Sequence, residues 1–142
     1  MKYYIASSLT NTAQVRRIMG TLDTEGHICT YDWTVESDKS LVTIAREELE
    51  AIRASDVLIF VPRASRGHHV ELGYAMALQK PTILFFDFVV DHIPFYYLCQ
   101  YSVGTMDELV NKMASLQVRS AIDEVAEAER QINKDMKRYR EM

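Results

Sequence analysis

The stretch DVLIFVPRASRGHHVELGYAMALQKPTILFF, residues 56–86, decides the fold of this chain. Val57–Val61 and Thr82–Phe86 are short, wholly apolar runs, typical of parallel strands that are covered on both faces. Between them the pattern predicts a loop that begins at Pro62 and a helix over about residues 68–79. Two parallel strands joined by a helix form a right-handed βαβ unit, and ligands bind beyond the carboxyl ends of such strands. The loop therefore lies where a ligand is expected.

Glu71 is the first candidate for chemistry in this unit. The predicted helix places it in the first turn, where free N–H groups and the helix dipole favour an ionised carboxylate. An ionised and partly buried carboxylate is a usable nucleophile. Position alone is also compatible with ordinary complementation of the helix dipole.

The loop and helix carry a resemblance to a known family. Its residues are Ser65, Gly67, Glu71, Leu72, Gly73, Ala75 and the closing Lys80-Pro81. Over roughly residues 3–105 the chain resembles the nucleoside 2-deoxyribosyltransferase family, including its relatives the 2'-deoxynucleoside 5'-phosphate N-hydrolases. That family carries Glu-Leu-Gly-x-Ala, a Gly/Gln-Lys-Pro stop and an apolar strand. The resemblance implies that Glu71 attacks the sugar of a substrate.

Composition limits the other possibilities. With 142 residues and 48% hydrophobic content, the chain is expected to form one domain with a substantial core. The net charge of −4 argues against a nucleic-acid surface, whereas a small anionic ligand remains possible at a local basic loop. Cys29 and Cys99 lack metal spacing, so we expect no disulfide framework, no metal and a reducing cytoplasm. No signal peptide or membrane-spanning run is expected, so the protein should be soluble and should not bind a membrane.

The amino terminus predicts a strand over Lys2–Ala6, a loop over Ser7–Asn11 and a capped helix. Ser7 and Ser8 are candidate substrate contacts, because such a turn presents free N–H groups to an anion. The loop lacks the glycines of a dinucleotide fingerprint, so no cofactor is expected. The resemblance places Tyr4 beside the nucleophile, although a tyrosine there is also a normal residue of a buried strand.

A second strand is predicted over His27–Trp33. Asp32 and Trp33 fall at its carboxyl end, on the ligand side of the sheet. The indole could stack on a planar base or could cap the core.

The next helix begins at Ser37–Ser40, runs to about Ser55 and contains a second carboxylate of interest. Glu48 projects into the middle of a stripe at helical spacing that we expect to be buried. An unpaired buried charge costs on the order of several kcal/mol, so such a group often has a raised pKa and can donate a proton. The predicted stripe consists of Leu41, Val42, Ile44, Ala45, Leu49, Ala51 and Ile52.

The resemblance points to the same position. The segment Glu48–Asp56 matches the part of the family in which an acidic residue, usually Asp, handles the proton of the leaving base. Here the residue is Glu, one methylene longer. Pairing of Glu48 with an Arg or Tyr of the core is the alternative.

The loop before Glu71 bears on the substrate. Ser65 stands where the nucleotide hydrolases of this family carry a Ser that touches the 5'-phosphate, and Arg66 and Gly67 follow it. The first loop has Thr10 where those hydrolases carry an Arg, so Arg66 could replace that cation. His69 is a candidate phosphate or base contact, or else a solvated loop histidine.

The carboxyl-terminal part predicts a subunit interface. An aromatic cluster, Phe95–Tyr97, precedes a fifth strand over Tyr101–Val103, and the resembling enzymes complete their sites in this region with a residue from a neighbouring subunit. Tyr97 or Ser102 could serve in that way. We expect a homo-oligomer with an α/β domain over residues 1–116 and an amphipathic helix over residues 117–142 that packs on the domain or on a neighbouring subunit.

The expected fold is α/β: a flavodoxin-like (Rossmann-like) sandwich of five parallel strands in the order 2-1-3-4-5, with helices on both faces and an extra C-terminal helix. The expected function is cleavage of the N-glycosidic bond of a 2'-deoxyribonucleoside or its 5'-monophosphate, with Glu71 as nucleophile and Glu48 as proton donor. The alternatives are a ribonucleotide N-glycosidase acting on CMP-like substrates and a nucleotide sensor without turnover. The sequence does not decide whether the sugar passes to water, as in a hydrolase, or to a second base, as in a transferase.

Overall fold

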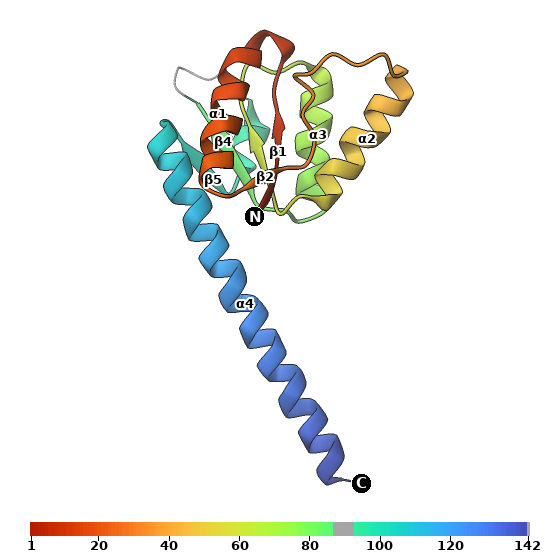
Figure 1. The fold of residues 1–142 in the computed structure, drawn as a ribbon, viewed down its shortest axis with the longest axis vertical. Helices are drawn as coiled ribbons and strands as arrows, with labels where there is room; N and C mark the ends of the chain where they lie inside the picture. Colours follow the sequence, from red (N-terminus) through yellow and green to blue (C-terminus); the bar gives the residue numbers. More distant parts are fainter. Residues whose placement is uncertain (87–92, 142) are drawn as a thin grey trace. The chain divides into compact units, whose positions relative to one another are not determined.

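The computed structural model describes residues 1–86 and 93–141, which form a five-stranded parallel sheet flanked by helices (Figure 1). In chain order the strands and helices are β1 (Lys2–Ala6), a 3-10 turn η1 (Leu9–Asn11), α1 (Thr12–Thr24), β2 (Ile28–Cys29), α2 (Leu41–Ala54), β3 (Val57–Phe60), α3 (Arg66–Ala77), β4 (Thr82–Phe85), a second 3-10 segment η2 (Pro94–Leu98), β5 (Tyr101–Val103) and α4 (Met106–Arg140).

The strand order is β2-β1-β3-β4-β5, and every neighbouring pair is parallel. This confirms the predicted flavodoxin-like order. β3 and β4 are buried at all their positions, as expected for strands with continuous apolar sequence that helices cover on both faces. The register sets Tyr4 opposite Leu58 and Ile59 opposite Ile83.

Different helices cover the two faces of the sheet (Figure 1). On one face, α1 contributes Val15, Ile18 and Leu22 to the core, and the hydroxyl of Tyr3 donates to Asp23 of that helix at 3.0 Å. On the other face, α2 and α3 pack against the alternate residues of β1, β3 and β4. Because side chains alternate along a strand, Tyr4 points to the α2 and α3 side.

The second strand is much shorter than predicted: the pattern indicated residues 27–33, but β2 covers only Ile28–Cys29. The backbone N–H of Ile28 donates to the carbonyl of Met1, and that of Thr30 to the carbonyl of Tyr3. The next carbonyl in this series is that of Ile5, which accepts the indole N–H of Trp33 at 2.7 Å instead. A side chain therefore ends the ladder.

The predicted buried stripe of α2 is wrong at most of its positions: Leu41, Val42, Ala45 and Leu49 are exposed. Leu41 is 84% exposed and Val42 60% exposed, and only Ala51 and Ile52 of this helix are buried. Ser40 caps the helix by accepting from the N–H of Thr43 at 3.2 Å. Helical spacing marks an apolar face, but it does not distinguish a face that packs on its own sheet from one that stays exposed.

The chain divides into two units, Met1–Val110 and Asn111–Met142. The first unit holds the whole sheet. The described part of the second unit is the continuation of α4 as one uninterrupted helix to Arg140. No helix of the described residues is both long enough and apolar enough to cross a membrane.

Candidate active site

Two buried side chains from different elements meet at the carboxyl side of the sheet. Tyr4 lies on β1 and is fully buried, and Glu71 lies on α3 and is only 8% exposed. The hydroxyl of Tyr4 donates to Oε1 of Glu71 at 3.1 Å. The other carboxylate oxygen, Oε2, is buried and has no hydrogen-bond donor among the described residues. A buried polar atom without a partner is costly, so it marks a position where a ligand or a proton is needed.

Glu71 is not in the first turn of its helix, contrary to the prediction. α3 begins at Arg66, two residues before the predicted start, so Glu71 is its sixth residue and lies in the second turn. The dipole falls off within the first turn and cannot keep this group ionised. Burial, followed by the negative charge of Glu48, raises the pKa of Glu71 to about 8. The carboxyl therefore tends to hold a proton at neutral pH, although the Tyr4 hydroxyl acts in the opposite direction.

Glu48 on α2 is the third member of this group. It is half-buried, and burial raises its pKa above the ordinary value for a glutamate. The two carboxyls are close enough to share a hydrogen bond once one of them is protonated. Two neighbouring carboxyls resist ionising together, which favours a state of the pair with one proton. Such a pair can supply a nucleophile and an acid at the same time.

Tyr4 acts as a fixed donor to this pair. Burial and then the charge of Glu71 hold the pKa of Tyr4 far above its usual range. The hydroxyl therefore stays protonated at neutral pH. Its hydrogen bond to Oε1 leaves Oε2 as the oxygen of Glu71 that can react.

An aromatic cluster, formed by Phe60, His69 and Tyr96, packs beside this group. The rings of His69 and Tyr96 are stacked, with an interplanar angle of 7° and centroids 5.7 Å apart. Nδ1 of His69 donates to the carbonyl of Ser65 at 2.8 Å, so in the neutral ring Nε2 accepts from the Tyr96 hydroxyl at 2.9 Å. His69 is thus fixed in orientation and is not a solvated loop residue.

Sequence reasoning missed Tyr96 and Phe60 as parts of this cluster. Tyr96 lies in η2 and is buried, whereas its neighbours Phe95 and Tyr97 are 63% and 73% exposed. The predicted aromatic cluster therefore divides into one inward and two outward side chains. A 3-10 segment distributes side chains in this way, but no signal in the sequence predicted that segment.

The serines of the first loop are engaged within the protein. Ser7 is fully buried, and its hydroxyl donates to the carbonyl of Val61 at 2.8 Å, which ties the ends of β1 and β3 together. Asn11 donates to the same hydroxyl at 2.9 Å. Ser8 caps η1 by accepting from the N–H and the hydroxyl of Thr10. Asn11, the residue before α1, makes no side-chain cap bond to that helix.

Asp32 and Trp33 hold the loop after β2. The carboxylate of Asp32 accepts from the N–H of Thr34 at 3.0 Å and from its hydroxyl. Trp33 packs against the core and donates to Ile5, as described above. A cavity of about 690 Å³ opens along this loop and is lined by Tyr31, Asp32, Val35, Glu36, Ser37, Asp38 and Lys39.

The loop before α3 contains the predicted phosphate contacts. The backbone N–H of Ser65 donates to Nδ1 of His68 at 2.9 Å, and the hydroxyl of Ser65 lies 2.9 Å from the same nitrogen. Arg66 is exposed, and no ion pair of the described residues includes it. Gly67 is surrounded by open space, since a Cβ there would meet nothing within 4 Å. Ser65, which precedes α3, and Arg66, the first residue of α3, are both exposed.

The two residues predicted to serve a neighbouring subunit lie beyond the group around Glu71. Tyr97 is on η2, and Ser102 is exposed on β5, an edge strand of the sheet. Both side chains are accessible to another subunit, and their contribution to the site of a neighbouring subunit stays a prediction.

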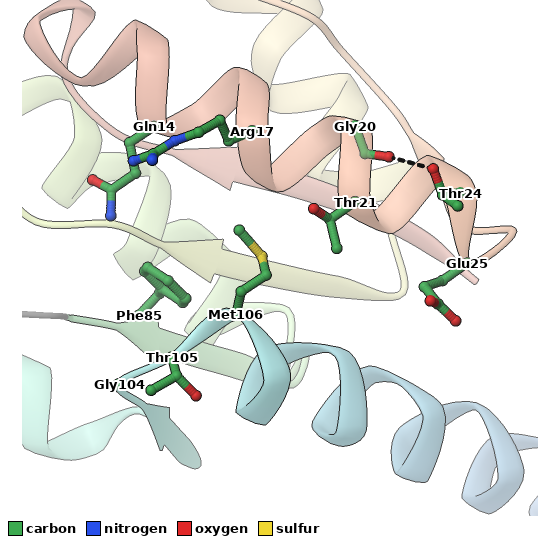
Figure 2. Close-up of a pocket in the computed structure, with 10 residues that line it drawn as sticks. All are labelled: Gln14, Arg17, Gly20, Thr21, Thr24, Glu25, Phe85, Gly104, Thr105 and Met106. Carbon is green, nitrogen blue, oxygen red and sulfur yellow. Dashed lines mark hydrogen bonds between the residues drawn. The ribbon is translucent and has the colours of Figure 1, made fainter.

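A second cavity, of about 670 Å³, lies on the opposite side of the sheet (Figure 2). Figure 2 shows its lining from α1, the end of β4 and the start of α4, together with the hydrogen bond from Thr24 to Gly20. Of its ten lining residues, only Arg17 and Glu25 are ionisable. The lining has no paired carboxyls, and the group around Glu71 is the better candidate for chemistry.

Comparisons with known proteins give one family. The sequence profile of the family "Nucleoside 2-deoxyribosyltransferase" matches residues 3–117. No curated protein sequence matches the chain significantly.

Solved structures share the fold. A CMP N-glycosidase from Clostridium botulinum has a TM-score of 0.55 and 18% identity, over 80% of this chain and 98% of the other. A 2-deoxyribosyltransferase from Bacillus psychrosaccharolyticus has a TM-score of 0.61 and 18% identity, over 78% and 91% of the two chains. A conserved protein from Enterococcus faecalis V583 has a TM-score of 0.55 and 16% identity, over 81% and 98%.

Proposed function

Because this chain belongs to the nucleoside 2-deoxyribosyltransferase family, we propose that it cleaves the N-glycosidic bond of a 2'-deoxyribonucleoside or its 5'-monophosphate. The observation that carries this proposal is the environment of Glu71. One oxygen is held by Tyr4, the other is buried without a donor, and a second carboxyl stands beside it. This is the arrangement that a covalent glycosidase mechanism needs: a nucleophile and an acid within one short distance.

In the first step, Oε2 of Glu71 attacks the anomeric carbon as the bond from that carbon to the base nitrogen breaks. The protonated carboxyl of Glu48 gives its proton to the leaving base. The products of this step are the free base, a glycosyl ester on Glu71 and an ionised Glu48. In the second step Glu48 accepts a proton from water, or from an incoming base, as that nucleophile displaces Glu71 from the sugar. The configuration at the anomeric carbon is retained.

The reaction depends on which carboxyl of the pair, Glu48 or Glu71, holds the proton. At neutral pH one proton is held between Glu48 and Glu71, and burial favours its position on Glu71. Attack requires that proton on Glu48. The positive charge that develops on the sugar stabilises the anionic form of Glu71, and the Tyr4 hydroxyl stabilises it further. As this charge develops, the proton therefore passes from Glu71 to Glu48 and from Glu48 to the leaving base.

The remaining contacts form a proposal for substrate binding. Ser65 ends the loop after β3 and Arg66 is the first residue of α3, and in these positions they can hold a 5'-phosphate. The cavity beside Asp32 offers space for a base. The hydroxyls of Ser7 and Ser8 are used within the protein, so their role is to shape the first loop.

A ribonucleotide substrate is the second candidate. One of the similar structures is described as a CMP N-glycosidase, at 18% identity. The two possibilities differ at one group, the 2'-hydroxyl, so matched ribose and deoxyribose substrates distinguish them. A nucleotide sensor without turnover is the third, and it requires binding with no release of base.

The test is release of free base from deoxynucleosides, ribonucleosides and their 5'-monophosphates, with and without an acceptor base. We expect release by the wild type and a loss of roughly 10³-fold or more in Glu71→Ala, because the covalent route is removed. Glu50→Ala is a matched control, since Glu50 is exposed on α2. Nucleotide binding without release of any base would refute the enzymatic proposal and support a sensor.

A further inference from the structure

The carboxyl-terminal part of α4 has an exposed apolar stripe that the proposed reaction does not use. Ile122 is 62% exposed, Val125 59% and Ile132 58%. The stripe positions follow each other by alternating steps of four and three residues, which is the heptad spacing of a coiled coil. They are Val118, Ile122, Val125, Glu129, Ile132, Met136 and Tyr139.

A helix with such a stripe is not self-sufficient in water. Helical stability in proteins comes mainly from the packing of an apolar face, and the stripe residues of the second unit are exposed in the single chain. A spacing of 3.5 residues keeps the stripe on one side of the helix over three heptads, which matches a partner that is itself a long helix. A curved domain surface does not require that regularity.

The charges along the helix identify the partner. Residues 118–129 contain one cationic and four acidic side chains, a net charge of −3, whereas residues 130–141 contain five cationic and two acidic side chains, a net charge of +3. A helix with two halves of opposite sign is complementary to a second copy of itself that runs in the opposite direction. Parallel pairing would set like charges side by side over the whole length.

We propose that residues 118–139 form an antiparallel coiled coil with the same helix of a second copy of this chain. The stripe has a consistent antiparallel register. Ile122 then packs against Tyr139 of the second copy and Val125 against Met136 of the second copy. Glu129, the one charged residue of the stripe, faces Ile132 of the second copy near the centre, where the two halves of opposite charge meet.

Small residues beside the stripe suit close packing. Ala126 and Ala128 flank the centre of the stripe at positions where longer side chains would hold two helices apart. The pairing closes by a two-fold axis, so it forms a dimer and does not propagate.

Cross-linking of the full chain tests the direction of the helices. In a Cys29→Ser/Cys99→Ser background, Ile122→Cys, Tyr139→Cys and the double variant are treated with a short bis-maleimide. Residues 122 and 139 of one helix are 17 positions apart, or about 25 Å, so the cross-linker cannot join them within one chain. The antiparallel register predicts cross-linked dimers for the double variant and none for either single variant. Dimers from each single variant would show parallel pairing, and no dimer from any variant would show no pairing; both results overturn the proposal.

The mass in solution provides an independent test. Ile122→Asp places a charge in the stripe, and Ser120→Asp places the same charge on the exposed opposite side as a matched control. Analytical ultracentrifugation should give half the wild-type mass for Ile122→Asp and the wild-type mass for Ser120→Asp. Circular dichroism of both variants shows whether α4 stays helical. An unchanged mass for Ile122→Asp would contradict the proposal, whatever further association the α/β domain contributes.

Discussion

Glu48→Gln removes the ionisable neighbour of Glu71 and keeps the size of the side chain, so it separates two effects of Glu48. One effect is donation of a proton to the leaving base. The other is the negative charge that, after burial, raises the pKa of Glu71. In the variant the donor is lost, and the pKa of Glu71 falls from about 8 while burial keeps it above the ordinary value.

The two effects have different sizes. With a pKa of about 8, about one tenth of Glu71 is ionised at pH 7, so full ionisation can raise the rate by at most about tenfold. Loss of a general acid lowers the rate by roughly 10²- to 10⁴-fold when the base needs a proton to leave. The net effect on an ordinary deoxynucleoside is therefore a large loss.

The assay compares an ordinary purine deoxynucleoside with its 7-methyl derivative, whose base already carries a positive charge and leaves without protonation. For Glu48→Gln we expect kcat/KM to fall by at least roughly tenfold on the ordinary substrate, and to stay equal or rise by up to about tenfold on the methylated one. The acid limb of its pH profile on the methylated substrate should move to lower pH, following the pKa of Glu71. Glu50→Gln, exposed on the same helix, should leave both rates unchanged. Equal losses on the two substrates, or no loss on either, would refute the assignment of Glu48 as proton donor.

Three further outcomes are expected. Tyr4→Phe removes the donor to Oε1 of Glu71 and should lower kcat/KM by roughly 10- to 150-fold, which corresponds to the loss of a hydrogen bond to a charged group. Tyr3→Phe, on the other face of the sheet, is the control and should not lower kcat/KM. A small effect of Tyr4→Phe, or equal effects of the two variants, would contradict the role of Tyr4. Glu71→Gln should raise the free energy of unfolding at pH 8 by at most about 5 kcal/mol and have little effect near pH 4, as measured by thermal unfolding. The pKa of Glu71 is raised in the folded state, so the wild type loses stability as the pH rises from the unfolded-state pKa to about 8, and the variant does not. A gain in stability that does not depend on pH would contradict the raised pKa of Glu71. Arg66→Ala should raise KM for 5'-monophosphates and leave KM for nucleosides unchanged. Arg63→Ala, which changes an exposed arginine of the loop before α3, is the control. A similar change of KM for both substrate types would argue against a phosphate contact at Arg66.

The sheet was predictable from sequence because its signals are local and strong. Continuous apolar runs such as Val57–Phe60 indicate buried parallel strands, and the right-handed crossover then restricts the strand order. The resemblance and the helical spacing both directed attention to Glu48, and the structure brings it beside Glu71 and Tyr4. The fold of the sheet and its helices brings these residues together, because Tyr4 and Glu71 are 67 positions apart in the sequence.

Other features depend on contacts that periodicity does not encode. The end of β2 is set by the indole of Trp33, which takes a carbonyl that a strand would have used. Leu41 and Val42 have the spacing of a core stripe but lie on an exposed part of α2. The raised pKa of Glu71 comes from its burial and then from the charge of Glu48. Its position near the start of a predicted helix indicated neither of these contacts, because both depend on the packing of α3 against α2 and the sheet.

The most direct test of the account is the covalent ester on Glu71. Wild-type protein is mixed with a substrate whose base it releases, quenched in acid within one turnover and digested for mass spectrometry, with Glu71→Gln treated in parallel. A covalent glycosyl intermediate on Glu71 should add the mass of one sugar residue to the peptide that contains Glu71, and the variant should show no such mass. Release of base with no sugar attached to any peptide, or attachment at Glu48, would contradict it.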